Sequence, residues 1–222
     1  NTTADNNVAV GVNALTADTL GDRNVAIGAA ALASQNFTTS TDVYNVGVGY
    51  LAGFSITTGQ VNTIVGGLAG DAITTGDHNV AIGVNSMGGN TASNKNTAVG
   101  SNSLLSFNVT TDTDTLNTAV GYEAGKSMTT GVSNTILGGT AGDALTDADF
   151  NVAVGMGALS ADTLGSKSTA IGQSALNAQN FTTATDSHNT AVGFQAGKSV
   201  TTGIQNTLIG SLAGDALTDA DF

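Results

Sequence analysis

The phrase NVAIG at residues 24–28 indicates the fold, because close variants of it recur along the whole chain. NTAVG at 117–121 and NTLIG at 206–210 are two of them. Each copy reads as Asn or Ser, Val or Thr, a mostly small apolar residue, an aliphatic residue, and Gly. The twelve copies begin at Asn7, Asn24, Asn45, Asn62, Asn79, Asn96, Asn117, Asn134, Asn151, Ser168, Asn189 and Asn206. Their spacing of 17 or 21 residues is typical of a solenoid, in which each repeat, here called a rung, stacks on the next.

A longer period of 72 residues lies above the single rung. Every super-repeat has one 21-residue rung in second place, and the super-repeats occupy 7–78, 79–150 and 151–222 without a gap. Residues 1–6 are interpreted as the end of a preceding super-repeat. This regularity predicts one continuous solenoid with no linker.

Composition narrows the classes of function. The 222 residues include 30 Gly and no Pro, Cys or Trp. With 40% hydrophobic and only 10% charged residues the chain has enough apolar material for a core, unlike a disordered segment. A net charge of −12 argues against binding to nucleic acid or to an anionic membrane surface. The absence of Cys excludes a disulfide scaffold, and no stretch resembles a signal peptide or a membrane-spanning helix, so we expect no membrane insertion.

The phrase itself predicts a short strand that is apolar on both faces. Side chains alternate along a strand, so the second and fourth residues share one face and the third lies on the other. We expect the second and fourth positions, such as Val10 and Ile27, to line the core. The third position, such as Ala26 or Ile64, is then expected to face another copy of the chain, because strands apolar on both sides are buried on both sides.

The fifth position is Gly in every rung, which indicates a positive φ angle or a close backbone approach. These predicted turn residues are Gly11, Gly28, Gly49, Gly66, Gly83, Gly100, Gly121, Gly138, Gly155, Gly172, Gly193 and Gly210. Further columns of Ala, Leu or Gly, and Thr follow, and we interpret each rung as two short strands joined by two Gly-assisted turns. The Asn column fits amide ladders along the axis or caps of individual turns, and both interpretations stay open.

At these phrases the chain resembles two classes of fibrous protein. NVAIGAAALA at 24–33 is similar to the head repeats of trimeric autotransporter adhesins. NTAVGYEAGKSMTTG at 117–131 and NTAVGFQAGKSVTTG at 189–203 resemble repeats of bacteriophage tail fibres. The resemblance implies a left-handed parallel β-roll, a homotrimer with the flat strand facing the threefold axis, and the Val10 and Ile27 column as core. Two features depart from the adhesin pattern. The rungs are longer, and the second rung of each super-repeat carries a four-residue bulge.

Two segments of the sequence resemble ligand-binding motifs. GYEAGKS at 121–127 and GFQAGKS at 193–199 have three residues between their glycines, whereas a phosphate-binding loop needs four, so the structural interpretation is favoured. Asp71, Asp143 and Asp215 are candidate calcium ligands. They recur only once per four rungs, which favours solvated acidic turns over a metal site.

Catalytic equipment is sparse. The chain has only two histidines, His78 and His188, and no Ser–His–Asp arrangement recurs. Asp42, Asp114 and Asp186 in the bulge are the candidates for glycan cleavage by paired carboxylates. Without Trp, platforms for sugar stacking are lacking, and we expect neither enzymatic activity nor a cofactor.

Two further polar features, a column of Thr and a set of Asn-X-Thr sequences, recur along the chain. A column of Thr recurs in the 17-residue rungs and raises an ice-binding alternative, although the neighbouring position varies and the bulge interrupts the array. Asn36, Asn108 and Asn180 each begin an Asn-X-Thr acceptor sequence for N-glycosylation. Repeat duplication together with turn chemistry is the favoured explanation of these sequences, unless the source has a suitable glycosylation pathway.

The sequence therefore predicts an all-β parallel β-solenoid, or β-roll, of about twelve rungs that forms a homotrimeric fibre. The predicted function is the structural shaft of an extended surface fibre on a virion or cell, with a bacteriophage tail fibre ranked first. A bacterial surface adhesin is the second hypothesis, and an ice- or surface-binding solenoid is the alternative from another class. The expected partners are further copies of the chain, a distal receptor-binding domain and a host surface receptor.

Overall fold

The computed structural model describes residues 4–221, and the described chain is an all-β parallel β-solenoid of about 12 rungs without a helix. Residues 1–3 and 222, the outer ends of the predicted repeat boundaries, lie outside the described residues. The chain divides into two compact units, residues 1–115 and 116–222, which are described separately below. The division falls inside the super-repeat 79–150.

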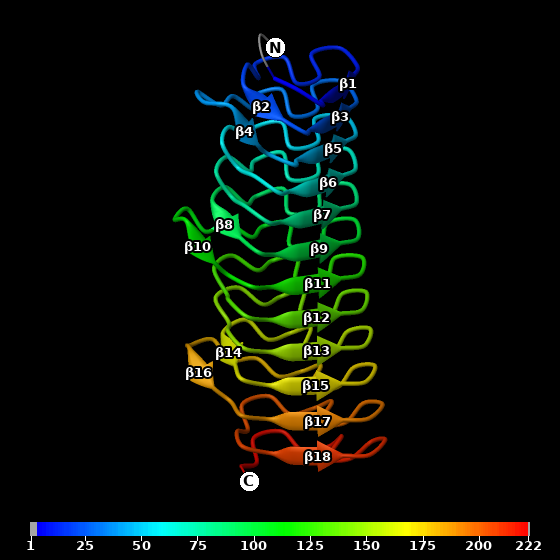
Figure 1. The fold of residues 1–222 in the computed structure, drawn as a ribbon. Helices are drawn as coiled ribbons and strands as arrows, with labels where there is room; N and C mark the ends of the chain where they lie inside the picture. Colours follow the sequence, from blue (N-terminus) through cyan, green and yellow to red (C-terminus); the bar gives the residue numbers. More distant parts are fainter. Residues whose placement is uncertain (1–3, 222) are drawn as a thin grey trace. The chain divides into compact units, whose positions relative to one another are not determined.

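Each unit is a ladder of six three-residue parallel strands (Figure 1). In the first unit the order is β1 (Val8–Val10), β3 (Val25–Ile27), β5 (Val46–Val48), β6 (Thr63–Val65), β7 (Val80–Ile82) and β9 (Thr97–Val99). In the second it is β11 (Thr118–Val120), β12 (Thr135–Leu137), β13 (Val152–Val154), β15 (Thr169–Ile171), β17 (Thr190–Val192) and β18 (Thr207–Ile209). Equivalent positions of the phrase pair at every step, so Ala26 pairs with Ala9 across a 17-residue rung and with Gly47 across a 21-residue rung.

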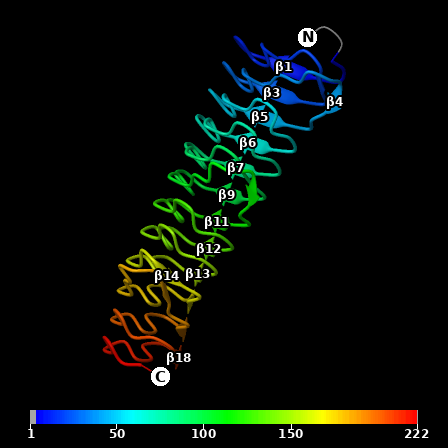
Figure 2. The same ribbon diagram turned by 90° about the vertical axis from the view of Figure 1, so that its left-hand side faces the viewer.

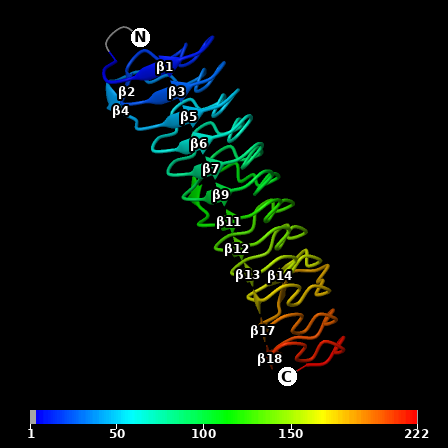
Figure 3. The ribbon, with the colours of Figure 1, turned by 90° about the vertical axis from the view of Figure 1, so that its right-hand side faces the viewer.

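The extra four residues of the 21-residue rung form a lobe beside the stack (Figures 1 to 3). Each lobe adds one pair of two-residue parallel strands: β2 (Gly21–Asp22) with β4 (Thr41–Asp42), β8 (Ser93–Asn94) with β10 (Thr113–Asp114), and β14 (Gly165–Ser166) with β16 (Thr185–Asp186). The prediction of two strands in every rung is therefore wrong for the described rungs away from a lobe, where the rest of the rung consists of turns.

The predicted orientation of the ladder strands is also wrong. The third position of the phrase points inward: Ala26, Ile64, Ala98 and Ala170 are 0% exposed. The fourth position points outward, and Ile27 is 39% exposed. Val10 and Ile27, which the sequence and the resemblance placed in the core, thus belong to the outer face.

The core is narrow, and this explains why the small residue lies inside. In the second and third rungs, Leu32 fills the space beside the small residues: a Cβ added at Gly47 would lie 2.7 Å from Leu32 Cγ. In the fourth rung the arrangement is reversed, since the third position is Ile64 and the inward residue opposite is Gly70. A Cβ added at Gly70 would lie 3.0 Å from Ile64 Cδ1. Close packing therefore does not leave room for a large side chain at both of these facing positions in the same part of the core.

The Asn column forms a buried spine of hydrogen bonds along the stack. Asn62 is 0% exposed, and its Oδ1 accepts a bond from Asn79 N at 2.9 Å, while its own N–H donates to Asn45 Oδ1 at 2.8 Å. Its Nδ2 donates to Gly76 O, 14 residues further along the chain, at 2.8 Å. Asn134 additionally donates to Val132 O, two residues before it in the chain, at 3.2 Å. Both earlier interpretations of the column therefore hold together, with side chain–backbone bonds along the axis predominating.

The Gly column stands directly after the ladder strands, where successive rungs approach most closely. Gly121 has φ +142°, and a Cβ there would lie 2.5 Å from the Gly138 carbonyl oxygen of the next rung. Non-glycine residues also take left-handed conformations elsewhere in the rung. The residue before each phrase has a positive φ, including the β-branched Val61 at φ 56°. Because β-branched residues rarely adopt this region, the backbone at Val61 is strained, and the surrounding rungs keep it in this conformation.

Candidate functional site

The outward sheet face is formed by the second and fourth positions of the phrase, whose side chains point away from the core. It consists only of Val, Thr, Ile and Leu, although the chain carries a net charge of −12. In the interior of the units Ile82 is 37%, Leu137 47% and Ile171 38% exposed. A regular apolar stripe of this kind is unusual for a lone soluble chain, whose exposed apolar patches stay within a few hundred Å².

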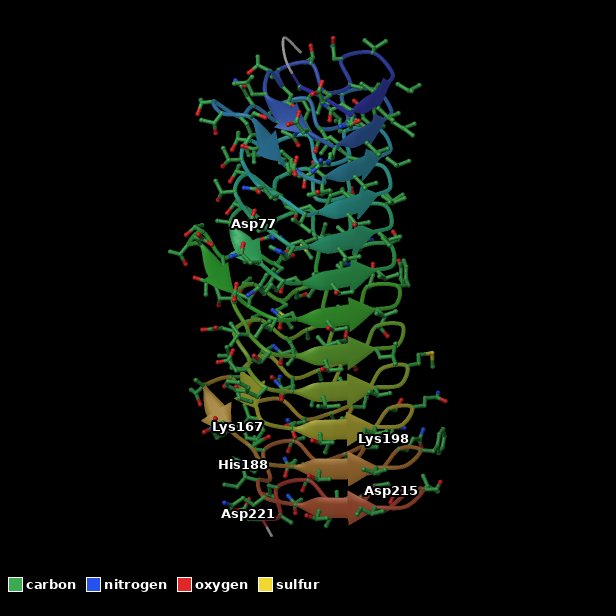
Figure 4. All side chains as sticks on the ribbon, viewed as in Figure 1. Asp77, Lys167, His188, Lys198, Asp215 and Asp221 are labelled. Carbon is green, nitrogen blue, oxygen red and sulfur yellow. The ribbon has the colours of Figure 1, made fainter. Side chains whose placement is uncertain are left out.

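Three of the five Lys and Arg residues lie at one edge of this face. Each is the residue directly before a phrase, where the backbone has a left-handed conformation. Arg23, Lys95 and Lys167 stand there and pair with Asp42, Asp114 and Asp186 of the lobes. The Lys167–Asp186 pair measures 2.5 Å, and the Arg23 guanidinium also lies over the Tyr44 ring at 5.5 Å. Figure 4 shows Lys167 and His188 at this edge, and Lys198 and Asp215 beyond the opposite ends of the strands.

These ion pairs bear on the three Asp residues considered for glycan cleavage. The hydrogen bond from Lys95 is the main cause that holds the pKa of Asp114 below its ordinary value. A general acid requires the opposite shift, because it must keep its proton near neutral pH. Since the pairs are about half exposed, each contributes little to stability. The geometry therefore gives Asp42, Asp114 and Asp186 a role in holding the lobes against the stack.

The candidate calcium ligands stand on separate rungs. Asp71 and Asp143 are half-buried, and burial raises the pKa of both carboxyls. Asp143 Oδ1 is buried without a hydrogen-bond partner in the described structure. Asp215 is exposed. Within residues 4–221 no three acidic or histidine side chains come together as ligands for one metal ion.

The phosphate-loop-like segment 121–127 runs from the end of β11 into the following turn. Its Lys126 Nζ lies 3.0 Å from Glu123 Oε1 in the same segment. The hydrogen bond to Glu123 is also the main cause that raises the pKa of Lys126. The lysine is thus engaged by a neighbouring carboxylate, and Gly121 serves the stacking of rungs.

Several hydroxyls of the Thr column donate hydrogen bonds to backbone carbonyls of the next rung along the stack. Thr57 Oγ1 donates to Thr74 O at 3.2 Å, and Thr74 Oγ1 donates to Thr91 O at 3.0 Å. Thr146 donates to Thr163 O at 3.0 Å in the second unit. Hydroxyl protons used in this way are not available to order water, which argues against the ice-binding alternative.

The three Asn-X-Thr sequences lie where a lobe leaves the stack. Asn36, Asn108 and Asn180 are exposed, and their Oδ1 atoms accept bonds from Thr19, Thr91 and Thr163 at 3.0, 2.9 and 3.1 Å. These bonds support the turn-chemistry interpretation and leave the amide nitrogens on the outside.

Sequence reasoning overlooked one group of surface residues, the column that follows the strand-end glycine. Tyr50, Tyr122 and Phe194 in this column are 61%, 59% and 46% exposed. Their recurrence every 72 residues, next to an apolar strand, was the available signal.

Within residues 4–221 the structure has no pocket and no helix that could span a membrane. The outward sheet face is therefore the feature of the described chain best suited to an interaction. Comparison with protein-family models, with curated proteins and with solved structures finds no match.

Proposed function

We propose that this chain is the structural shaft of an extended surface fibre, in which three copies pack their outward sheet faces around a common axis. The single observation that carries the proposal is the uncharged face of Val, Thr, Ile and Leu side chains that is repeated on every rung. Closed rotational symmetry covers such a face without producing open-ended aggregates. Acidic residues of the three copies stay outside this contact and remain solvated.

The energetics favour association along the full length of the shaft. Burying a Val, Leu or Ile side chain completely is worth about 1.5–3 kcal/mol, so residues such as Leu137 that are already half covered gain roughly half of that. The gain recurs on each rung, whereas the loss of translational and rotational freedom occurs once per association. Added rungs thus strengthen the assembly, as a long spacer requires.

A bacteriophage tail fibre is the setting that the sequence supports best, on the resemblance of segments 117–131 and 189–203 to tail-fibre repeats. The shaft then holds a distal receptor-binding domain away from the virion so that it meets a receptor on the host surface. The role is mechanical, and the chain contributes stiffness and length.

Adjacent residues of the same strands provide a matched test. Ile82, Leu137 and Ile171 point outward on β7, β12 and β15, while Ala81, Ile136 and Ala170 point inward beside them. Replacing the outward three with Glu should separate the chains and leave the β-structure intact. Replacing the inward three with Glu should destroy the rungs, because a charge buried without a partner is strongly unfavourable.

Circular dichroism and mass measurement in solution distinguish these outcomes. An outward triple variant that keeps the mass of the parent assembly would refute the proposed packing. The setting is tested separately, by locating the chain on intact virions with antibodies in electron micrographs. Finding it on a cell envelope and not on a virion would overturn the tail-fibre proposal.

A further inference from the structure

The two edges of the outward sheet face vary together from rung to rung. We call the residue directly before each phrase the leading edge, and the residue directly after the strand-end glycine the trailing edge. In chain order the leading edge reads Asn6, Arg23, Tyr44, Val61, His78, Lys95 in the first unit and Leu116, Ser133, Phe150, Lys167, His188, Gln205 in the second. The trailing edge of the same rungs reads Val12, Ala29, Tyr50, Gly67, Val84, Ser101 in the first unit and Tyr122, Gly139, Met156, Gln173, Phe194, Ser211 in the second.

Large uncharged side chains occupy both edges of the same rungs. In the second unit Leu116 and Tyr122 share one rung, and Phe150 and Met156 share another. These four side chains are 54% to 59% exposed, so their own chain leaves more than half of each in water. Three further rungs follow the same rule: Tyr44 with Tyr50, His78 with Val84, and His188 with Phe194.

The basic residues of the leading edge stand on other rungs, where the trailing edge is small or polar. Arg23, Lys95 and Lys167 share their rungs with Ala29, Ser101 and Gln173, respectively. A large apolar side chain facing one of these cations would take water away from its ion pair with the lobe, and the removal of charge from water is costly. The remaining glycines and serine of the trailing edge accompany uncharged residues: Val61 with Gly67, Ser133 with Gly139, and Gln205 with Ser211.

Contacts within one chain do not explain this match. Leu116 and Tyr122 are separated by the whole of β11 and by the residues at its two ends. At ~3.3 Å per residue the two positions lie roughly 15–20 Å apart, too far for their side chains to pack together. Duplication of the super-repeat does not explain the match either, since it copies each edge but does not require the two edges to agree.

A closed ring of copies brings the two edges together. If the copies turn their outward sheet faces toward a rotation axis parallel to the stack, the leading edge of each copy meets the trailing edge of its neighbour. Because a closed ring has no shift along its axis, the edges that meet belong to the same rung. The partner that fits the edges is therefore a second copy of the chain, aligned rung for rung.

We propose that the leading and trailing edges form the seam between neighbouring copies, with Leu116 of one copy packed against Tyr122 of the next and Phe150 against Met156. This inference rests on the proposed homotrimer and adds to it the side chains that join its copies. A shift by one rung would set Lys167 against Met156 or Phe194 and would take its ion pair with the lobe out of water. The matched edges thus favour a closed ring over a staggered, open-ended filament.

Pairs of introduced cysteines test the seam, because the chain has no Cys of its own. Leu116→Cys with Tyr122→Cys, and Phe150→Cys with Met156→Cys, each place one thiol on either edge of the same rung. The matched controls use the same four positions but are offset by two rungs: Leu116→Cys with Met156→Cys, and Phe150→Cys with Tyr122→Cys. Two rungs correspond to ~10 Å along the stack, whereas a disulfide requires Cα atoms within about 7 Å of each other.

Mild oxidation followed by electrophoresis without reductant gives the readout. Sedimentation before oxidation gives the mass of each variant, and circular dichroism verifies its folding. The same-rung pairs should yield covalent trimers, with at least about tenfold more cross-linked product than the offset pairs.

The outcomes separate the seam from the homotrimer on which it rests. A monomeric parent would refute the homotrimer, and the seam with it. A trimeric parent whose same-rung pairs cross-link no better than the offset pairs would overturn the seam and leave the homotrimer standing. Cross-linked products that extend beyond three chains would overturn the closed ring.

Discussion

The glycines at the ends of the ladder strands allow the energetic effect of close stacking between rungs to be tested by adding a single Cβ atom. Gly138 has φ +137°, and an added Cβ would lie 2.7 Å from the carbonyl carbon and oxygen of Gly155 on the next rung. Gly210 has nearly the same conformation, with φ +129°, but among the described residues a Cβ there would meet only Ala213 Cβ at 3.9 Å. Gly138→Ala thus adds strain and a collision, and Gly210→Ala adds strain alone.

The expected magnitudes follow from this difference. A side chain in this region of φ costs about 1–3 kcal/mol in either variant. At Gly138 the two rungs must also separate, which weakens the bond from Gly155 N to Leu137 O, 2.8 Å long in the parent. A buried backbone group left without its partner costs about 1–3 kcal/mol more. For a chain of this size the extra loss corresponds to a melting temperature lower by roughly 2–12 °C.

Differential scanning calorimetry of the two variants and the parent provides the assay, and hydrogen exchange at Gly155 reports the local opening. We expect Gly138→Ala to melt well below Gly210→Ala, with faster exchange confined to the rungs beside the substitution. Equal melting temperatures for the two variants would refute the argument that close approach between rungs, in addition to φ, requires glycine.

Three further outcomes are expected. Asp143→Asn should be more stable than the parent at neutral pH, because burial raises the pKa of this carboxyl and disfavours its charged form. The difference in stability should shrink as the pH falls through the raised pKa, because the parent then regains stability by binding a proton. Melting curves measured over a range of pH check this, and they would show the opposite trend if the carboxylate were stabilising. Val61→Asn should raise the free energy of unfolding by about 1 kcal/mol, since Asn tolerates the left-handed conformation that strains Val; a lower melting temperature would contradict this. Asn134→Ala should lower the free energy of unfolding by about 2–6 kcal/mol, because it leaves Asn151 N and Ala148 O unpaired. A loss below about 1 kcal/mol in denaturant titrations would count against the buried spine of hydrogen bonds.

The sequence was sufficient for the rung and its register, because the phrase repeats so regularly that only one alignment satisfies all copies. It was misleading about inside and outside. A strand apolar on both faces gives no amphipathic signal, so Ala26 and Ile27 were assigned to the wrong faces. The correct orientation was indicated by two positions of the rung that vary together. Where the third position of the phrase is the large Ile64, the facing residue is Gly70, and where the third position is small, the facing residue is large, as at Leu32.

The turns were beyond prediction for a different reason. Residue preferences indicate left-handed conformations at glycine, whereas here Leu15, Val61 and Phe150 also adopt positive φ angles. Hydrogen bonds between rungs and the packing of the core impose these conformations, and such forces depend on the stack as a whole.

The mass of the parent assembly in solution tests the proposed homotrimer. Sedimentation equilibrium of the 222-residue chain at micromolar concentration should give three times the mass of one polypeptide, which is 21.7 kDa. A species with the mass of a single polypeptide, with its β-structure intact, would contradict the account, because the outward sheet face would then remain exposed to water along its whole length.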